Sequence, residues 1–224
     1  AASDVYKRQF LYLTETKSYQ LPTPPQMHNK GNYIISLSDF TKWLAQQAEE
    51  LEVEIYPGFA ASEVLFDENN KVLGIATCDM GRLKDGSEGP NFERGIELRA
   101  KQTIFSEGCR GHLGKILMEK FNLNSDNSPQ TYGIGIKELW EVTPENSKPG
   151  SIMHTTGWPL DNDTYGGSFL YHLDNNKVSI GFVIGLDYKN PYLSPYLEFQ
   201  RFKHHPEIEK LLEGGRRITV SNTH

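Results

Sequence analysis

The sequence predicts two kinds of layer in one chain of 224 residues: an α/β region, followed by an α+β module built on an antiparallel sheet. Two observations predict this fold class. A strand, a helix and a second strand follow one another between about residues 31 and 58, which is the pattern of a parallel βαβ unit. From about residue 124, short β-rich runs separated by Pro, Gly, Asn and Asp favour antiparallel strands instead. The length is sufficient for a sizeable core.

The first 28 residues are predicted to be an irregular N-terminal segment and a crossover. Residues 1–9 show neither a helical nor an alternating apolar period, and they lack the apolar core of a secretory signal. Residues 19–30, YQLPTPPQMHNK, carry three prolines, which do not fit the interior of a helix. We therefore expect the first ordered unit to begin at about residue 29.

The predicted βαβ unit begins with the β-branched, apolar run GNYIISL, residues 31–37. Ser36 and Asp39 then form the S-x-x-D pattern of a helix start. The apolar residues that recur at helical spacing after it are Phe40, Trp43, Leu44, Ala48 and Leu51. VEIYPG, residues 53–58, is predicted as the second strand. The unit therefore indicates a parallel sheet.

A hairpin and a strand-to-helix turn are predicted next. Residues 61–78 show two strands with Asp67 to Asn70 as their turn, and a polar, glycine-rich loop follows. Residues 95–106 are again strand-like and continue into EGCRGHLGKILMEKF, where Leu113, Ile116, Leu117 and Phe121 have helical spacing. The region from 29 to 123 is therefore expected to be α/β.

The antiparallel module is predicted from four β-rich runs, at residues 131–142, 151–159, 166–173 and 177–186. A helical tail over residues 193–215 follows, broken at Pro206 and ended by Gly214 and Gly215. We expect these elements to form a second domain.

Composition excludes several classes of function. The 29 acidic against 23 basic residues give a net charge of −6, which argues against binding to a nucleic-acid backbone. Cys78 and Cys109 are the only cysteines, so this chain alone provides neither a disulfide framework nor a four-thiolate iron–sulfur site. They indicate a reducing compartment. No stretch approaches the roughly 20 apolar residues of a membrane-spanning helix, which leaves a chain that does not span a bilayer but is able to rest on one.

The segment SEGCRGHLGK, residues 106–115, is the most informative local feature. A strand that ends in glycine and feeds a helix lets backbone N–H groups face a phosphate or another anion. Its glycines do not form the G-x-G-x-x-G fingerprint, and a glycine-tolerant strand-to-helix turn is the alternative. Neither catalytic nor metal-ligating residues are predicted, because no histidine spacing suits a metal and no Ser or Cys lies in a nucleophile elbow. His204 and His205 are expected to be solvated or to cap a helix.

The pair Gly166-Gly167 interrupts an otherwise aromatic, strand-like run. A glycine inside a strand marks a bulge, or a place where a ligand or another backbone approaches closely. Six aromatic residues near the pair either line a flat apolar pocket or fill a β core: Trp158, Tyr165, Phe169, Tyr171, Phe182 and Tyr188.

Several long blocks together resemble the family of electron-transfer-flavoprotein:ubiquinone oxidoreductases. The resemblance is carried by residues 31–66, KQTIFSEGCRGHLGK, PQTYGIGIKELWEV, GWPLDNDTYGGSFLYHL, GLDYKNPYLSPYLEFQRFKHHP and LEGGRRI. It extends from about Phe10 to Ile218. Residues 1–9 and 219–224 do not match, so we expect an internal fragment with foreign ends.

The resemblance implies part of a glutathione-reductase-like FAD-binding domain at residues 29–123. It also implies an inserted, antiparallel ubiquinone-binding domain at 124–218 and an unmatched tail at 219–224. The implied cofactors are FAD and a [4Fe-4S] cluster, with reduced electron-transfer flavoprotein as electron donor and ubiquinone as acceptor. The implied place is a membrane surface, the matrix side of the mitochondrial inner membrane or the equivalent bacterial membrane.

Site residues are implied in the same way. FAD would lie near Phe59, Ala60, Ala61, Ser106, Glu107 and Gly108, and the quinone head group near the backbone of Gly166 and Gly167. The G-x-G-x-x-G that grips FAD in this family and the cysteines that hold its cluster are absent from this sequence, so the chain alone is expected to be inactive. Two alternatives are a FAD-dependent monooxygenase or isoprenoid reductase of the same superfamily, and a non-catalytic remnant module.

Overall fold

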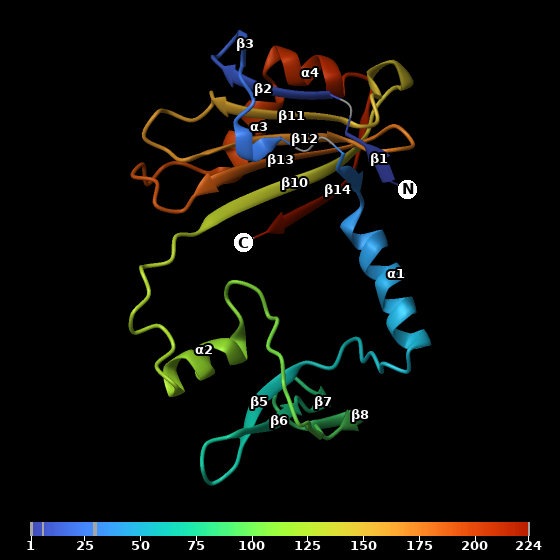
Figure 1. Cartoon of the computed structure of the whole chain (residues 1–224), viewed down its shortest axis with the longest axis vertical. Coiled ribbons are helices and arrows are strands. Elements are labelled where there is room, and N and C mark those ends of the chain that lie inside the picture. Colours follow the sequence, from blue (N-terminus) through green and yellow to red (C-terminus); the bar gives the residue numbers. More distant parts are fainter. Residues whose placement is uncertain (1, 6, 29–30, 224) are drawn as a thin grey trace. The chain divides into compact units, whose positions relative to one another are not determined.

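The computed structural model describes residues 2–5, 7–28 and 31–223, which form two compact units (Figure 1). The sheet unit comprises the described parts of residues 1–46 and 130–224, and the hairpin unit comprises residues 47–129. The division between them lies inside helix α1 (Leu37–Glu50). These boundaries differ from the domain boundaries that the sequence predicts after residues 28 and 123.

A seven-stranded sheet forms the sheet unit, in the order β14-β10-β13-β12-β11-β2-β3. Its strands are β2 (Lys7–Leu13), β3 (Ser18–Leu21), β10 (Gly133–Glu141), β11 (Ser151–Gly157), β12 (Gly166–His172), β13 (Lys177–Gly185) and β14 (Arg216–Thr223). Within this sheet, β11 and β2 pair in parallel and the other neighbours pair antiparallel. A separate two-stranded ribbon joins β1 (Ala2–Asp4) to β4 (Tyr33–Ile35), and short 3-10 helices lie at Pro25–Met27 and Pro144–Asn146.

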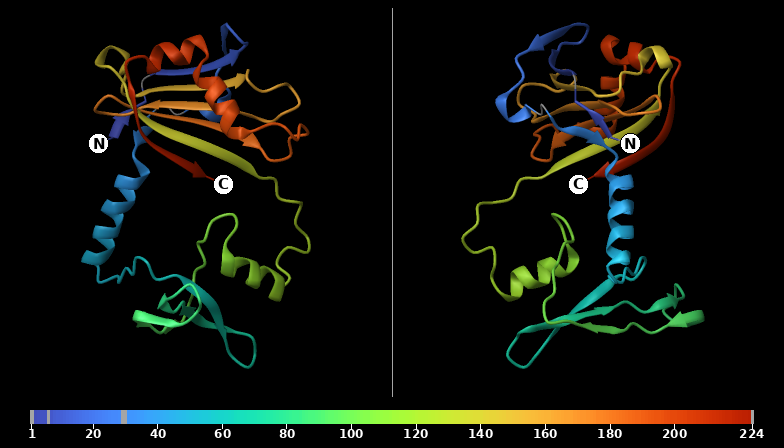
Figure 2. Two further views of the ribbon diagram at one scale, coloured as in Figure 1. Left: turned by 180° about the vertical axis from the view of Figure 1, so that it is seen from behind. Right: turned by 45° about the vertical axis from the view of Figure 1, so that its right-hand side comes forward.

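Two helices cover one side of this sheet, as the views in Figure 2 show. Helix α3 (Pro195–Lys203) begins at Ser194, whose hydroxyl accepts a hydrogen bond from the Leu197 N–H. Helix α4 (Pro206–Leu212) begins at His205, whose ring accepts from the Glu207 N–H. Both helices start with proline, which suits a first helical position because its missing N–H is not needed there.

The core lies between these helices and the sheet. On β13, residues 178, 180, 182 and 184 are buried, because alternate residues of a strand point to the same side. Phe182, Phe199 and Phe202 pack their rings together with centroids 5.4–6.5 Å apart. We call this side of the sheet the helix face, and the other side, which carries residues 179, 181, 183 and 185 of β13, the opposite face.

The hairpin unit contains a three-stranded sheet of β5 (Ala61–Phe66), β6 (Val72–Thr77) and β9 (Glu97–Arg99). A second hairpin joins β7 (Met80–Arg82) to β8 (Glu88–Glu93), and helix α2 (His112–Lys120) completes the unit. Leu113 of α2 is 1% exposed, and the rings of Phe66 and Phe121 lie 6.1 Å apart. Few other side chains of the hairpin unit are buried.

Several sequence predictions are confirmed. The four β-rich runs form β10 to β13, and the tail forms α3 and α4 with the break at Pro206. The predicted hairpin turn is held by the Asp67 carboxylate, which accepts hydrogen bonds from the N–H groups of Asn69 and Lys71 at 2.9 and 2.8 Å. Asn70 adopts a φ of 62°, a conformation that Asn tolerates well.

The predicted parallel βαβ unit is wrong. Its helix exists as α1, but the first strand, β4, pairs antiparallel with β1, and residues 53–58 form no strand. The α1 residues Phe40, Trp43 and Leu44 are 43–52% exposed, so helical periodicity here marks an apolar side that nothing buries within the described chain. The loop predicted after residue 78 is instead the β7–β8 hairpin, and the strand predicted at 95–106 is limited to Glu97–Arg99.

The prediction that residues 1–28 are irregular is also wrong for most of the described part. Residues 7–13 form a strand in the seven-stranded sheet, with Leu11 and Leu13 buried in its core. Residues 7–13 pair with β11, about 140 residues later, and with the neighbouring strand β3, and this pairing makes the segment regular. Residues 216–223 likewise form the edge strand β14 on β10, so the tail predicted at 219–224 is part of the sheet as far as 223. Residues 1, 6, 29, 30 and 224 lie outside the described residues.

Candidate functional site

Gly166 and Gly167 begin strand β12, at one end of the seven-stranded sheet. They pair regularly with Ile184 and Val183 of β13, without a shift in register. The bulge that sequence reasoning offered as one explanation of the pair is therefore wrong. Because successive residues alternate between faces, Gly166 lies on the helix face with Ile184, and Gly167 lies on the opposite face with Val183.

Close packing explains why both positions lack a side chain. A Cβ atom at Gly166 would lie 2.5 Å from Cδ1 of Leu160 and 2.4 Å from the Val183 carbonyl oxygen. A Cβ atom at Gly167 would lie 2.5 Å from the carbonyl oxygen of Thr155 on β11. Another backbone does approach these glycines, as the alternative interpretation of the pair expects.

The opposite face next to Gly167 carries a row of rings. The Phe169 ring lies over Gly181, where a Cβ atom would come within 2.2 Å of it. Tyr171 follows on the same strand, with its ring centroid 5.4 Å from that of Phe169. The His154 ring, on β11, meets Tyr171 edge-on at 5.7 Å. The row therefore runs along β12 away from Gly167.

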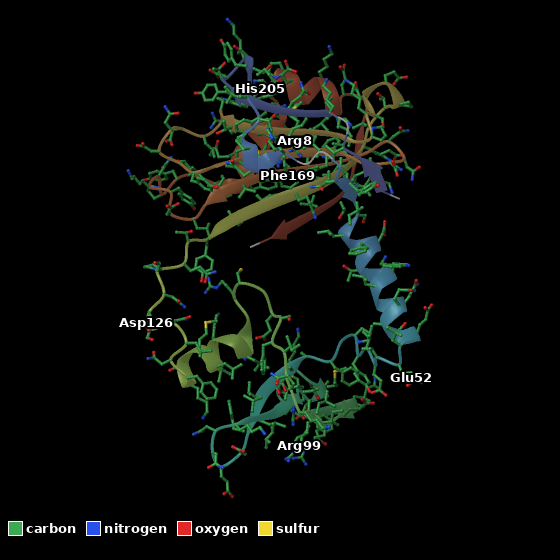
Figure 3. The ribbon with its side chains drawn as sticks, viewed as in Figure 1. Arg8, Glu52, Arg99, Asp126, Phe169 and His205 are labelled. Carbon is green, nitrogen blue, oxygen red and sulfur yellow. The ribbon has the colours of Figure 1, made fainter. Side chains whose placement is uncertain are left out.

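A cavity of about 680 Å³ lies at the far end of this row, wholly within the sheet unit. Its apolar lining is Val5, Ile34, Ile35, Leu37, Leu139, Ile152, Phe169 and Leu173, and its hydroxyl groups include those of Tyr171 and Ser179. Lys137 is the one charged residue among the described residues that line it. Arg8 of β2, labelled in Figure 3 together with Phe169, is paired with the cavity residue Ile152 of β11. The size is typical of a small-molecule site.

Burial and charge shift two pKa values on this face. Burial lowers the pKa of His154, and the positive charge of Arg8 lowers it further. Burial raises the pKa of Tyr171. The Tyr171 hydroxyl and His154 Nε2 are 3.3 Å apart. At neutral pH the imidazole is therefore uncharged and the phenol keeps its proton.

The six aromatic residues grouped by the sequence divide between the two faces. Phe182 fills the core of the helix face, and Trp158 and Tyr188 pack against that core. Phe169 and Tyr171 line the cavity of the opposite face. Tyr165 is 80% exposed. Core filling and pocket lining are thus both present, in different members of the group.

Glu107 occupies the start of α2, where the sequence suggests an anion site. Its carboxylate accepts hydrogen bonds from the N–H groups of Leu113 and Gly114, at 3.1 and 2.7 Å. These bonds, the Leu113 one foremost, lower the pKa of Glu107. A Cβ atom at Gly111 would lie 2.6 Å from the Glu107 side chain. The glycine there makes room for the chain's own carboxylate, which takes N–H groups that a phosphate would need.

Phe59, Ala60 and Ala61 lead into β5 in the hairpin unit, which also contains Ser106, Glu107 and Gly108. Phe59 is 44% exposed and meets Tyr56 edge-on at 5.9 Å. The Ala60 carbonyl accepts a hydrogen bond from the Cys78 N–H at 2.8 Å. Gly108 has a φ of 79°, which only glycine adopts readily.

Metal ligands are not gathered anywhere in the described part of the chain: no group of three His, Cys, Asp or Glu side chains is placed to hold an ion. Cys78 and Cys109 are both exposed and form no disulfide. None of the described helices is both long and apolar enough to cross a membrane.

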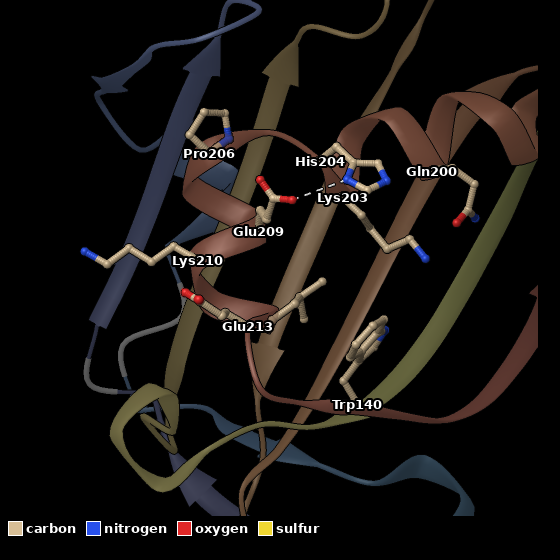
Figure 4. A pocket seen from close by; sticks show the side chains of 9 residues that line it. Trp140, Gln200, Lys203, His204, Pro206, Glu209, Lys210 and Glu213 are labelled. Carbon is tan, nitrogen blue, oxygen red and sulfur yellow. Dashed lines mark hydrogen bonds and ion pairs between the residues drawn. The ribbon is translucent and has the colours of Figure 1, made fainter.

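A buried ion cluster on the helix face escaped sequence analysis. Glu138 is completely buried, and its carboxylate binds Lys203 at 2.9 Å, Arg217 at 3.2 Å and the Trp140 indole N–H at 2.8 Å. Lys203 and Trp140 also line a cavity of about 600 Å³ beside α3 and α4, shown in Figure 4. The sequence does contain a signal. Glu138 lies two residues after Ile136 in the strand-like run IKELW, and alternate residues of a strand share a face, so a charged residue is placed on the face where Ile136 is buried.

Three histidines of the sheet unit take no part in the candidate site. His205 is fully buried and caps α4, with its other ring nitrogen 3.1 Å from the Thr14 carbonyl oxygen. The capping interpretation is confirmed for His205, whereas His204 is exposed. His172, on the helix face of β12, is 4% exposed, and burial lowers its pKa to about 4.

Comparison with known proteins identifies relatives of this chain. Residues 132–223 match the family model of the ETF-QO ubiquinone-binding domain. The chain is also 57% identical to a mitochondrial electron transfer flavoprotein-ubiquinone oxidoreductase of Dictyostelium discoideum, across 95% of this chain and 35% of that protein. Over nearly its whole length, the chain is therefore similar to electron transfer flavoprotein-ubiquinone oxidoreductases.

Bacterial members of the family match equally well. The oxidoreductase of Pseudomonas aeruginosa is 56% identical, across 91% of this chain and 37% of that protein. The chain thus spans about a third of the length of these curated relatives. The family model reaches residue 223, so the expectation that residues 219–223 lie outside the match is wrong.

Solved structures share the fold. A geranylgeranyl bacteriochlorophyll reductase-like protein of Thermoplasma acidophilum aligns with a TM-score of 0.68 at 17% identity, across 99% of this chain and 49% of that one. The flavin-dependent brominase Bmp2 aligns with a TM-score of 0.60 at 15% identity, across all of this chain and 50% of that one. At such identities the likeness establishes a shared mixed α/β fold.

Proposed function

We propose that the chain is part of an oxidoreductase that passes electrons from reduced electron-transfer flavoprotein, through FAD and a [4Fe-4S] cluster, to ubiquinone. The observation that carries the proposal is the family match of residues 132–223 to a ubiquinone-binding domain. In this proposal the sheet unit binds the quinone, and the hairpin unit belongs to a glutathione-reductase-like FAD domain into which the sheet unit is inserted. The whole protein, rather than this chain alone, is the enzyme.

The quinone head group would lie against the backbone of Gly166 and Gly167. The absence of side chains at both positions supports this, because it leaves the backbone at this end of β12 without a side chain that would keep a flat ring away. The neighbouring rings of Phe169 and Tyr171 supply an apolar surface of the kind that lines small-molecule sites.

FAD would lie near Phe59–Ala61 with its adenosine half, and near Ser106–Gly108. When bound, a flavin supplies the electron-transfer chemistry, and the protein sets its position and surroundings. The start of α2 does not fit a phosphate, because Glu107 already accepts from its N–H groups. The positive φ of Gly108 does fit a close backbone approach. The proposal therefore assigns Ser106–Gly108 to the flavin surroundings without a phosphate contact.

The cluster does not fit the described residues. A [4Fe-4S] cluster is held by four cysteine thiolates, and this chain has two cysteines. We propose that the ligands of the cluster lie outside this chain.

The proposed place is a membrane surface, on the matrix side of the mitochondrial inner membrane or on its bacterial equivalent. Exposed apolar residues at the Gly167 end of the sheet support this: Tyr165, Leu186 and Tyr192 are 80%, 47% and 93% exposed. Tyr165 and Leu186 lie close together, because Gly185 N–H donates to the Tyr165 carbonyl at 2.8 Å. A quinone dissolved in the bilayer would reach Gly167 past these side chains.

The test separates flavin reduction from quinone reduction. In the whole purified enzyme, Gly167→Val should slow the reduction of decylubiquinone about tenfold or more, while flavin reduction by reduced electron-transfer flavoprotein remains at the unmodified rate. Gly215→Val is the matched control, because a Cβ atom there also meets a backbone carbonyl oxygen, that of Glu141 at 2.8 Å, away from the proposed quinone site.

Loss of both rates with Gly167→Val, or an equal loss of quinone reduction with Gly215→Val, would mean that sheet distortion rather than the quinone contact explains the effect. Failure of the unmodified enzyme to reduce decylubiquinone with this donor would reject the function itself.

A further inference from the structure

His154 and Tyr171 form a hydrogen-bonded pair on the opposite face that the proposed function leaves unused. Tyr171 Oη and His154 Nε2 are 3.3 Å apart, and the two rings meet edge-on. The other ring nitrogen of His154, Nδ1, is buried and has no hydrogen-bond partner among the described residues. A buried polar atom without a partner is costly, so its persistence calls for an explanation.

The pair lies beside Gly167. His154 is directly opposite Phe169 in the β11–β12 pairing, and Gly167 is two residues further along β12. Directly paired residues share a face, so His154, Phe169, Tyr171 and Gly167 all lie on the opposite face. His154 and Gly167 are thus diagonal neighbours, whose backbones lie about 7–8 Å apart in antiparallel sheets. A ring placed at Gly167 comes within reach of the imidazole.

Charged and titratable groups surround the pair, and both of its members are uncharged at neutral pH. Arg8 on β2 faces His154, and Lys137 on β10 and Tyr33 on β4 line the same cavity as Tyr171. Burial and Arg8 lower the pKa of His154, so the imidazole is neutral and able to donate through one nitrogen while accepting through the other. No carboxylate is among the described residues that line this cavity.

We propose that His154 donates protons to the quinone bound at Gly167 and that Tyr171 positions and reprotonates it from the cavity. This rests on the proposed function. Reduction of a quinone to the quinol takes two electrons, supplied by reduced electron-transfer flavoprotein, and two protons. His154 releases the Nδ1 proton as an O–H bond forms on the quinone oxygen, and takes a proton at Nε2 from the Tyr171 hydroxyl. Water in the cavity reprotonates Tyr171 and leaves hydroxide, which solvent protons neutralise. The imidazole then gives its Nε2 proton to water and takes a proton from water at Nδ1, which restores its first tautomer, and the second proton follows.

Kinetics of variants provide the first test. In the whole enzyme, His154→Gln should lower kcat for decylubiquinone about 100-fold, with KM changed less than about threefold and flavin reduction unaffected. Tyr171→Phe should lower kcat about tenfold, since water can replace the hydroxyl. Imidazole added to His154→Ala should restore at least part of the rate, and the pH profile of kcat should lose its low-pH limb in this variant. His204→Gln, an exposed histidine of the same unit, is the control and should leave kcat unchanged.

A binding measurement that needs no turnover provides the second test. In ¹³C-histidine spectra, adding decylubiquinone to the oxidised protein should shift the His154 ring resonance and leave that of His172, on the other face of the sheet, in place. If His154→Gln does not fold, this titration decides alone, and an unmoved His154 resonance overturns the inference.

Two outcomes distinguish this inference from the proposed function. If the unmodified enzyme reduces decylubiquinone and His154→Gln keeps kcat within about twofold, His154 is not the proton donor, although the function stands. If the unmodified enzyme does not reduce the quinone at all, the proposed function fails first.

Discussion

The two faces of the seven-stranded sheet are built from the same strands but differ in what fills them. On the helix face, β13 contributes Val178, Ile180, Phe182 and Ile184, all at most 2% exposed, against α3 and α4. On the opposite face, the same strand contributes Ser179, Gly181, Val183 and Gly185. Strand alternation separates the two sets completely.

The difference shows where stability and chemistry reside. On the helix face, the buried carboxylate of Glu138 has three partners and His205 caps α4. The same face also has a cavity beside α3 and α4, and Nε2 of Gln200 is buried there without a hydrogen-bond partner among the described residues. The opposite face carries a cavity, the Phe169 ring over Gly181, and a histidine nitrogen that has no partner among the described residues. We conclude that the helix face contributes most of the packing that stabilises the sheet unit, and we propose that the opposite face binds a ligand.

The largest effect should come from removing a core ring. Phe202→Ala should lower the free energy of unfolding of the sheet unit by about 4 kcal/mol, because Phe202 is fully buried between two other phenylalanine rings. Phe169→Ala, on the opposite face, should lower it by only about 1–2 kcal/mol, because that ring is partly exposed. Urea unfolding of both variants measures the contrast, and equal losses would contradict the division of roles.

A smaller effect should follow from breaking the buried ion cluster. Lys203→Met leaves the Glu138 carboxylate buried with only Arg217 and Trp140, which should lower the free energy of unfolding by about 3 kcal/mol. The matched control is Arg201→Met on the same helix, whose bond to Glu198 is partly exposed and should contribute about 0.5 kcal/mol. Urea unfolding at pH 7 measures both, and a similar loss in the two variants would show that the cluster is not a stabilising feature.

The effect that is smallest near neutral pH, and grows as pH falls, concerns His172. The pKa of His172 is lowered from about 6.5 when unfolded to about 4 when folded. The unfolded chain therefore binds the proton first, so the contribution of His172 to stability is complete above pH 6.5 and is lost as pH falls to about 4. Its slope is at most about 1.4 kcal/mol per pH unit.

Unfolding measured between pH 7 and 4 should show a shallower slope for His172→Gln than for the unmodified protein, with His204→Gln unchanged as the exposed control. The lowered pKa of His154 acts in the same direction, so part of the slope should persist in His172→Gln. An unchanged slope in His172→Gln would mean that this histidine is solvated when folded.

Local features of the sequence were enough to predict much of the fold. The turn residues at 67–70, the breaks at Pro206 and Gly214, and the alternation along residues 166–186 each depend on near neighbours, so their strands and helices form where predicted. Gly166 and Gly167 were singled out as candidates for the same reason, since glycine inside an aromatic strand is a local anomaly. The family resemblance was likewise carried by contiguous blocks.

Pairing over long distances was not predictable in this way. Residues 7–13 become a strand because β11 provides a parallel partner, and the strand β4 pairs with β1 rather than joining a βαβ unit. The start of α2 suggested a ligand phosphate, but the carboxylate of Glu107 reaches it first, which the spacing of glycines alone does not reveal. His154 and Tyr171 are 17 residues apart, and no motif connects them.

The sequence by itself determined the local elements, the antiparallel character of the sheet and the family, because turn chemistry, strand alternation and long matching blocks are properties of short stretches of chain. Only the tertiary structure decided which face each strand residue occupies and which distant groups meet. Three features arise where burial brings separate strands and loops together: the Glu138 cluster, the His154–Tyr171 pair and the Glu107 carboxylate at the start of α2. The energy of burial depends on the complete packing and not on any one segment.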